Sequence, residues 1–157
     1  MRIVTRPDFD GIVCAVLLKD VLGNGTPIKW AEPNAVQNGL VEIKRGDVIA
    51  NLAYNKNGSL WFDHHLSNQT SVPFEGAFRI APSAARVVFD YYKDKFKQDY
   101  SELVEAADKI DSAQLSLDEV FHPENYSYIS LEMTINCQNT ADEPYWNRLV
   151  RLLGNHH

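Results

Sequence analysis

The stretch RIVTRPDFDGIVCAVLLKDVLGNG, residues 2–25, decides the fold class, because a short apolar strand leads directly into a long apolar helix. Residues 2–5 are predicted to form a buried strand, which the proline and glycine of residues 6–11 end. The spacing of apolar residues in residues 11–25 predicts a largely buried helix, with Asp10 as its expected N-cap. A strand followed by a buried helix is typical of a sheet covered by helices.

The rest of the chain continues this alternation and then becomes helical. Further strands are predicted at residues 27–33, 46–54 and 59–62, and further helices at residues 82–96, 101–114, 116–121, 128–137 and 143–154. The polar residues 67–78 are predicted to form a loop. This order favours an α/β fold with a mainly parallel sheet flanked by helices and a helical C-terminal part.

Composition and charge exclude several classes of protein. A chain of 157 residues predicts one domain, and 15 basic against 21 acidic residues argue against stable binding of duplex nucleic acid. A small phosphorylated substrate is compatible with this charge if a divalent cation is bound. Cys14 and Cys137 are far apart and predict no disulfide framework. With no apolar signal segment or membrane-spanning run, a cytoplasmic protein that binds no membrane is expected.

Acidic residues and histidines follow two of the predicted strands. Asp8 and Asp10 follow the first strand, and Asp63, His64 and His65 follow the strand at residues 59–62. If the two strands are parallel neighbours, both clusters lie at the same edge of the sheet. Carboxylate oxygens with imidazole nitrogens suit Mn²⁺, Fe²⁺ or Zn²⁺, and suit Mg²⁺ less well. The alternatives are that the aspartates only cap a helix and that the histidines are only exposed to solvent.

Two further groups of polar residues lie on predicted helices. Asp108 and Asp111 share a helix face, and either of them can complete a carboxylate site. Ser83 and the free N–H groups of the helix start can bind an anion, with Arg86 adding positive charge. The alternatives are a solvated helix face for the aspartates and an ordinary N-cap for Ser83.

The motifs PDFDG and DHH followed by an acidic helix, in this order, resemble those of the DHH phosphoesterase superfamily. Four longer segments are similar to bacterial proteins labelled exopolyphosphatase-related: VTRPDFDGIVCAVLLK, NLAYNKNGSLWFDHHLSN, APSAARVVFDYY and ADKIDSAQ. The resemblance runs from Met1 to about Glu119 and is vague beyond. It implies a Rossmann-like sheet, with a phosphoesterase domain at residues 1–122 and a helical extension at residues 123–157 packed on it. The family's second, substrate-binding domain is expected to be missing.

The resemblance also implies an activity and a set of site residues. The expected enzyme is a Mn²⁺-dependent phosphoesterase that hydrolyses a phosphodiester or phosphoanhydride in a nucleotide, a short oligonucleotide or polyphosphate. His64 matches the family's metal-binding histidine, and His65 matches a histidine that faces substrate. The expected metal ligands are Asp8, Asp10, Asp63, His64 and Asp111, with Asp108 as the alternative to Asp111; the expected catalytic residues are His65 and Asp8; the expected substrate contacts are Arg6, Ser83, Arg86 and His65.

Two positions depart from the family pattern. Val4 stands where many members have a histidine, and Asn51 stands where an aspartate bridges two metals. One well-bound Mn²⁺, or Mg²⁺ or another divalent cation, is therefore expected rather than two. The alternative function is a catalytically weak module that binds a nucleotide or phosphate with the same fold. The sequence leaves a homo-oligomer open, and the terminal His156 and His157 are excluded from the predicted site.

Overall fold

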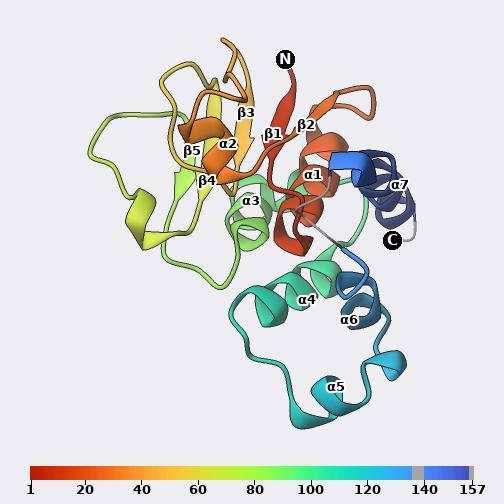
Figure 1. Cartoon of the computed structure of the whole chain (residues 1–157). Coiled ribbons are helices and arrows are strands. Elements are labelled where there is room, and N and C mark those ends of the chain that lie inside the picture. Colours follow the sequence, from red (N-terminus) through yellow and green to blue (C-terminus); the bar gives the residue numbers. More distant parts are fainter. Residues whose placement is uncertain (136–139, 156–157) are drawn as a thin grey trace.

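A parallel five-stranded sheet forms the centre of the computed structural model, which describes residues 1–135 and 140–155 (Figure 1). The strand order is β2-β1-β3-β4-β5, and every neighbouring pair is parallel. The strands are β1 (Ile3–Thr5), β2 (Ile28–Trp30), β3 (Val48–Ala50), β4 (Leu60–Asp63) and β5 (Gly76–Phe78). The predicted α/β fold with a parallel sheet flanked by helices is confirmed.

Seven α-helices surround or extend from the sheet. They are α1 (Phe9–Leu22), α2 (Pro33–Gln37), α3 (Ala84–Tyr92), α4 (Ser101–Asp111), α5 (Leu117–Phe121), α6 (Ser127–Glu132) and α7 (Glu143–Gly154) among the described residues. Short 3₁₀ turns lie at Leu66–Asn68, Lys93–Lys95, Pro123–Asn125 and Thr140–Asp142. No helix in residues 1–135 or 140–155 is both long and apolar enough to cross a bilayer.

The side chains of β1, β3 and β4 alternate between two separate cores, as the pleat of a strand requires. Ile3 and Phe62 join the larger core, which α1, α3, α4 and α7 cover. Val4 and Trp61, their neighbours in the chain, join a smaller core on the opposite face, which is closed by α2 and by loops. Since both faces are buried, the middle strands β1, β3 and β4 are mainly apolar, as expected for a parallel sheet.

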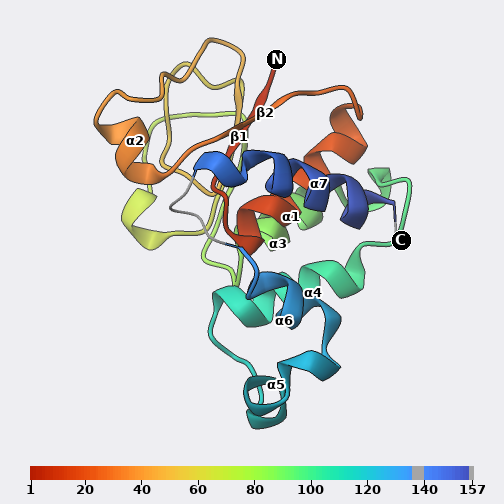
Figure 2. The same ribbon diagram turned by 45° about the vertical axis from the view of Figure 1, so that its right-hand side comes forward.

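Helix α1 is the central helix of the larger layer. It packs against α3, α4 and α7, and most of its side chains are buried. The last helix, α7, returns from the far end of the chain to lie beside α1, as both views show (Figures 1 and 2). Trp146 of α7 packs edge-on against Trp30 of β2, and the Trp30 indole N–H donates to Asn147 at 2.9 Å. The C-terminal helix therefore belongs to the main core.

Helices α4, α5 and α6 form a lobe that extends away from the sheet (Figures 1 and 2). The predicted boundary after residue 122 falls inside this lobe, where α5 contacts the turn Pro123–Asn125. The division into two parts at that residue stays a prediction.

Three elements differ from their predictions. Helix α1 begins at Phe9, and its N-cap is Asp8 rather than Asp10, because the Asp8 side chain accepts the Gly11 N–H at 2.7 Å. Strand β5 lies within the predicted loop; it is a three-residue edge strand that begins with glycine and carries little apolar signal. The helix predicted at residues 128–137 is shorter, and Cys137 lies outside the described residues.

We expect Gly76→Ala to lower the free energy of unfolding by roughly 2–4 kcal/mol. Gly76 has φ +119°, and a Cβ there would lie 2.1 Å from the Trp61 carbonyl oxygen. Gly25→Ala is the matched control, because a Cβ at Gly25 meets nothing within 4 Å. Urea denaturation of both variants measures the difference, and equal stabilities would contradict the placement of β5.

Candidate active site

The carboxyl ends of β1, β3 and β4 bring the predicted polar residues to one edge of the sheet. Asp8 and Asp10 follow β1, Asn51 follows β3, and His64 follows β4. The strand order reverses between β1 and β3, and such points commonly bind ligands in parallel α/β sheets. Gly11 permits the tight turn after β1, because a Cβ there would lie 1.9 Å from the Arg6 carbonyl oxygen.

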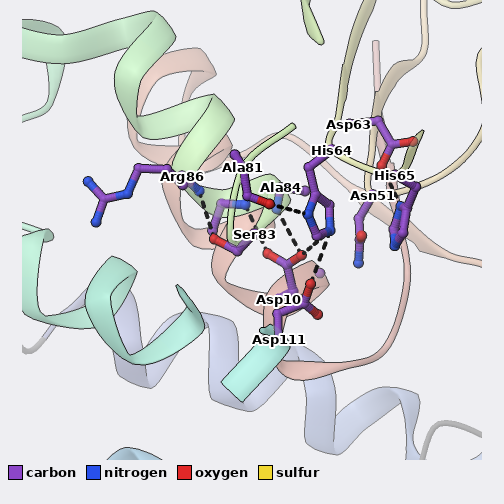
Figure 3. Close-up of polar contacts among 12 residues, drawn as sticks. Asp10, Asn51, Asp63, His64, His65, Ala81, Ser83, Ala84, Arg86 and Asp111 are labelled. Atoms are coloured by element: carbon purple, nitrogen blue, oxygen red, sulfur yellow. Dashed lines mark hydrogen bonds and ion pairs between the residues drawn. The ribbon is translucent and has the colours of Figure 1, made fainter. Parts of the chain in front are cut away.

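Asp10 joins the turn after β1 to the start of α3. Its side chain is 2% exposed, and its two oxygens each accept a backbone N–H at 2.9 Å, from Ala84 and Ala85 (Figure 3). Burial raises the pKa of Asp10 well above its usual value, and the charges of Asp111 and Asp8 raise it further, against the effect of the two N–H donors. The protein alone therefore does not fully compensate this negative charge.

His64 directs one ring nitrogen at two carboxylates. Its Nδ1–H donates to the Ala81 carbonyl at 2.9 Å, so in the neutral ring Nε2 carries the free lone pair. That Nε2 is buried, makes no well-aligned hydrogen bond, and lies 3.0 Å from Asp111 and 3.5 Å from Asp10 (Figure 3). Burial lowers the pKa of His64, but the contacts with Asp111, Ala81 and Asp10 outweigh it and raise the pKa to about 9.

These three side chains fit a divalent metal ion. One ligand atom each from Asp10, His64 and Asp111 lies within 4.8 Å of the others. A histidine that gives its second N–H to a backbone carbonyl is the usual arrangement at protein metal sites, since this bond fixes the ring and its tautomer. Burial, then the charges of Asp111 and Asp8, raise the pKa of Asp10, and the contacts with Asp111, Ala81 and Asp10 raise the pKa of His64. A bound cation would favour the charged carboxylates and the neutral imidazole.

The geometry separates the two aspartates of α4. Asp111 contacts His64, whereas Asp108 accepts hydrogen bonds from Ser83 Oγ at 2.7 Å and from Arg86 at 2.8 and 3.0 Å. Ser83 is fully buried, and Arg86 points away from His64 (Figure 3). Ser83 and Arg86 therefore hold α3 to α4, and the anion site predicted at the start of α3 is instead occupied by the carboxylate of Asp10.

His65 is oriented by a buried carboxylate. Asp63 has no exposed surface; one of its oxygens accepts His65 Nδ1–H at 2.7 Å, and the other accepts Asn68 Nδ2–H at 2.7 Å. Since both oxygens are engaged, this geometry gives Asp63 the role of positioning His65 and does not support its predicted role as a metal ligand. Asn68 was not among the predicted residues; its only signal in the sequence is a polar side chain just after the histidine pair.

Asp8 and Asn51 form a contact beside the cluster. Asn51 is buried with φ 61°, and its Nδ2 donates to Asp8 Oδ1 at 3.1 Å, while its Oδ1 has no hydrogen-bond partner. Burial raises the pKa of Asp8, although the Gly11 N–H, Arg6 and the Asn51 amide oppose this effect. Asp8 therefore lies next to the three-residue cluster, but its carboxylate already accepts hydrogen bonds from the Asn51 side-chain amide and from the Gly11 N–H. Val4 is fully buried in the smaller core, away from this edge.

Comparison with known proteins gives an informative match among solved structures. No family profile matches the chain, and no curated protein matches it. Among solved structures it is similar to PggH from Vibrio cholerae, a pGpG-specific phosphodiesterase, with 35% identity and a TM-score of 0.81. The match covers 98% of this chain and 52% of that one, so the chain spans about half the length of PggH. The ordered motifs, the histidine–carboxylate cluster and this likeness support the predicted resemblance to the DHH phosphoesterase superfamily.

Proposed function

We propose that this chain carries the catalytic centre of a divalent-metal-dependent phosphodiesterase that hydrolyses a small phosphorylated nucleotide. The observation that carries the proposal is the position of His64 Nε2, free of a well-aligned hydrogen bond and facing the carboxylates of Asp10 and Asp111. The likeness to a pGpG-specific phosphodiesterase supports a linear dinucleotide such as pGpG as the first substrate to test. The closer resemblance to exopolyphosphatase-related proteins stays a prediction, with polyphosphate as the comparison substrate.

The residues of the site have separate tasks in this proposal. Asp10, His64 and Asp111 would hold the ion, which supplies Lewis-acid catalysis at a phosphoryl group. His65 lies beside His64, with ring centroids 4.3 Å apart, and its Nδ1–H is fixed by Asp63. Its Nε2, when protonated, can donate to phosphate or to the departing oxygen. Arg6 adds a positive charge beside Asp8, at 3.7 Å.

Mn²⁺ is the proposed ion, and one ion is the proposed number. Two carboxylates and an imidazole suit Mn²⁺ better than Mg²⁺. Within the described part of the chain, the one other group with metal-ligand spacing is formed by Asp63, His64 and His65. It shares His64 with the first, and protein donors already engage both oxygens of its aspartate.

A second candidate function is a nucleotide-binding module with little or no turnover. The amide of Asn51 favours it, because a donor directed at Asp8 engages a carboxylate that a catalytic site would otherwise use. Thermal shift with pGpG, with and without Mn²⁺, separates the two functions when product release is followed in parallel. Stabilisation without release of a nucleoside monophosphate would favour the module.

We expect Asp111→Asn to weaken Mn²⁺ binding and pGpG hydrolysis by about 100-fold or more, since even the loss of a group that only orients a metal ligand costs about 10- to 100-fold. Asp111 is partly exposed, and its carboxylate accepts no N–H from the backbone of the described residues, so the thermal stability is expected to change little. Asp94→Asn is the control, because Asp94 is exposed and belongs to neither group of metal-ligand spacing in the described residues. Calorimetry with Mn²⁺ and product analysis measure both effects; unchanged Mn²⁺ affinity would contradict the assigned ligand.

The affinity for Mn²⁺ is expected to rise with pH. Without metal, His64 has a pKa of about 9 and is protonated at neutral pH, so binding must release a proton. The affinity should increase by about tenfold per pH unit between about pH 6 and about pH 8, and by more if Asp10 also loses a proton. Calorimetry in buffers of different ionisation enthalpy counts the protons. An affinity independent of pH would contradict His64 as a ligand, and His122→Gln, at an exposed histidine, should leave the slope unchanged.

Asn51→Asp is expected to increase the number of tightly bound Mn²⁺ ions from one to two. The substitution removes the amide that donates to Asp8 and places two carboxylates side by side, which a second cation would neutralise. Elemental analysis of protein loaded with Mn²⁺ and then desalted gives the count. Two equivalents already bound in the unaltered chain would show that Asn51 does not limit the site to one ion.

A further inference from the structure

Glu32 and Arg6 form a pair of charged side chains at the edge of the candidate active site. Arg6 follows β1 and Glu32 follows β2, the two neighbouring strands, and the Ala31 N–H donates to the Thr5 carbonyl at 3.0 Å where the strands end. Both side chains are partly buried, 27% exposed for Arg6 and 35% for Glu32. Glu32 lies on the side of β1 away from His64, because β2 and β3 flank β1 on opposite sides and β4 lies beyond β3.

The pair has hydrogen-bonding capacity that the described residues do not use. The approach between the two is loose, with 3.7 Å from Arg6 Nη2 to Glu32 Oε2. Arg6 Nε and Glu32 Oε1 are buried without a hydrogen-bond partner in the described part of the chain. Glu32 precedes α2, but its side chain accepts no capping hydrogen bond from that helix. Buried polar atoms are usually satisfied, so these two atoms are available to water, an ion or a ligand.

The pair is also close to the reacting centre. Arg6 Nε lies 3.7 Å from Asp8 Oδ2, so a single guanidinium group separates Glu32 from Asp8. Burial raises the pKa of Glu32, while the positive charge of Arg6 opposes that effect and the negative charge of Asp8 adds to it. Asp8 in turn affects the pKa of Asp10 in the metal-ligand cluster. The contacts from Glu32 to Arg6 and from Arg6 to Asp8 therefore lead from Glu32 towards the metal-ligand cluster.

We propose that Glu32 accepts a hydrogen bond from the ribose 2′-hydroxyl of the substrate and makes the site selective for ribonucleotides over deoxyribonucleotides. The inference rests on the proposed phosphodiesterase function and adds the sugar to it. In parallel α/β sheets that bind nucleotides, an acidic residue at the end of the second strand commonly holds a ribose hydroxyl, and Glu32 occupies that place. Arg6 offers its N–H groups to the adjacent phosphate.

The preference for ribose follows from the unpaired Glu32 carboxylate that a bound deoxyribonucleotide would leave. A carboxylate that loses its water on substrate binding and gains no hydroxyl stays unpaired, which disfavours the deoxy substrate. A hydrogen bond to a charged group in a partly exposed site corresponds to a preference of about 10- to 100-fold.

The test compares kcat/KM for pGpG and for its deoxyribose analogue in the full chain with Mn²⁺. The unaltered chain is expected to prefer the ribose form by about 10- to 100-fold, and Glu32→Ala to reduce that ratio to about one by slowing the ribose substrate. Glu32→Gln, which keeps the size and a neutral acceptor, should keep part of the preference. Glu75→Ala removes an exposed glutamate elsewhere and should leave the ratio unchanged. Mn²⁺ affinity should be the same in all four proteins.

Several outcomes would overturn the inference. They are equal rates on the two substrates in the unaltered chain, a ratio that survives Glu32→Ala, and an equal loss on both substrates in that variant. If neither dinucleotide is hydrolysed, the proposed phosphodiesterase function fails, and calorimetric binding of the two dinucleotides then decides on Glu32. Tighter binding of the ribose form that depends on Glu32 would uphold the inference without catalysis, whereas equal or absent binding would overturn it.

Discussion

The carboxylate of Asp10 is the contact on which both the fold and the site depend. It accepts the N–H groups of Ala84 and Ala85, and so joins the turn after the first strand to a helix more than seventy residues later. Hydrogen bonds to a charged group contribute about 1.5–3 kcal/mol each, while removing an ion from water costs several kcal/mol. The raised pKa of Asp10 indicates that the cost is the larger of the two. The contact fixes the geometry but leaves negative charge in excess.

That excess explains the arrangement around it. His64 receives its orientation from the Ala81 carbonyl, close to the start of the same helix α3, and turns its other nitrogen towards Asp10 and Asp111. Asp108, one turn earlier on α4, binds Ser83 and Arg86 and thereby holds α4 against α3. A structural network thus fixes the backbone, and a second set of polar groups on the same elements remains available to a cation.

The neighbouring half of the site has a different character. Asn51 directs an amide at Asp8, and Arg6 lies between Asp8 and Glu32 without a close contact to either. Here donors and acceptors alternate, whereas the cluster at His64 is mainly acidic. This contrast matches the needs of a nucleotide, with phosphate close to the cation and a sugar beside groups that can accept a hydroxyl.

The sequence alone determined the class of the fold and most of the site residues. Apolar runs two to four residues long, followed by Asp8, Asp10, Asp63 and His64, predict parallel strands with polar residues at their carboxyl ends, and the sheet has this form. The sequence did not predict strand β5, because a three-residue edge strand that begins with Gly76 is too short to show an apolar pattern.

Only the tertiary structure decided which side chains meet. Helical spacing cannot tell whether Asp108 or Asp111 faces His64, since both lie on one face of α4 and the choice depends on how α3 packs against it. The same holds for the start of α3. Its N–H groups were predicted to bind an anion, and in the fold two of them donate to Asp10 instead. Asn68 and Glu32 were not predicted as site residues, because their significance comes from groups that are adjacent in space. Local pattern specifies strands and helices, whereas the partners of a buried charge are set by contacts between residues far apart in the chain.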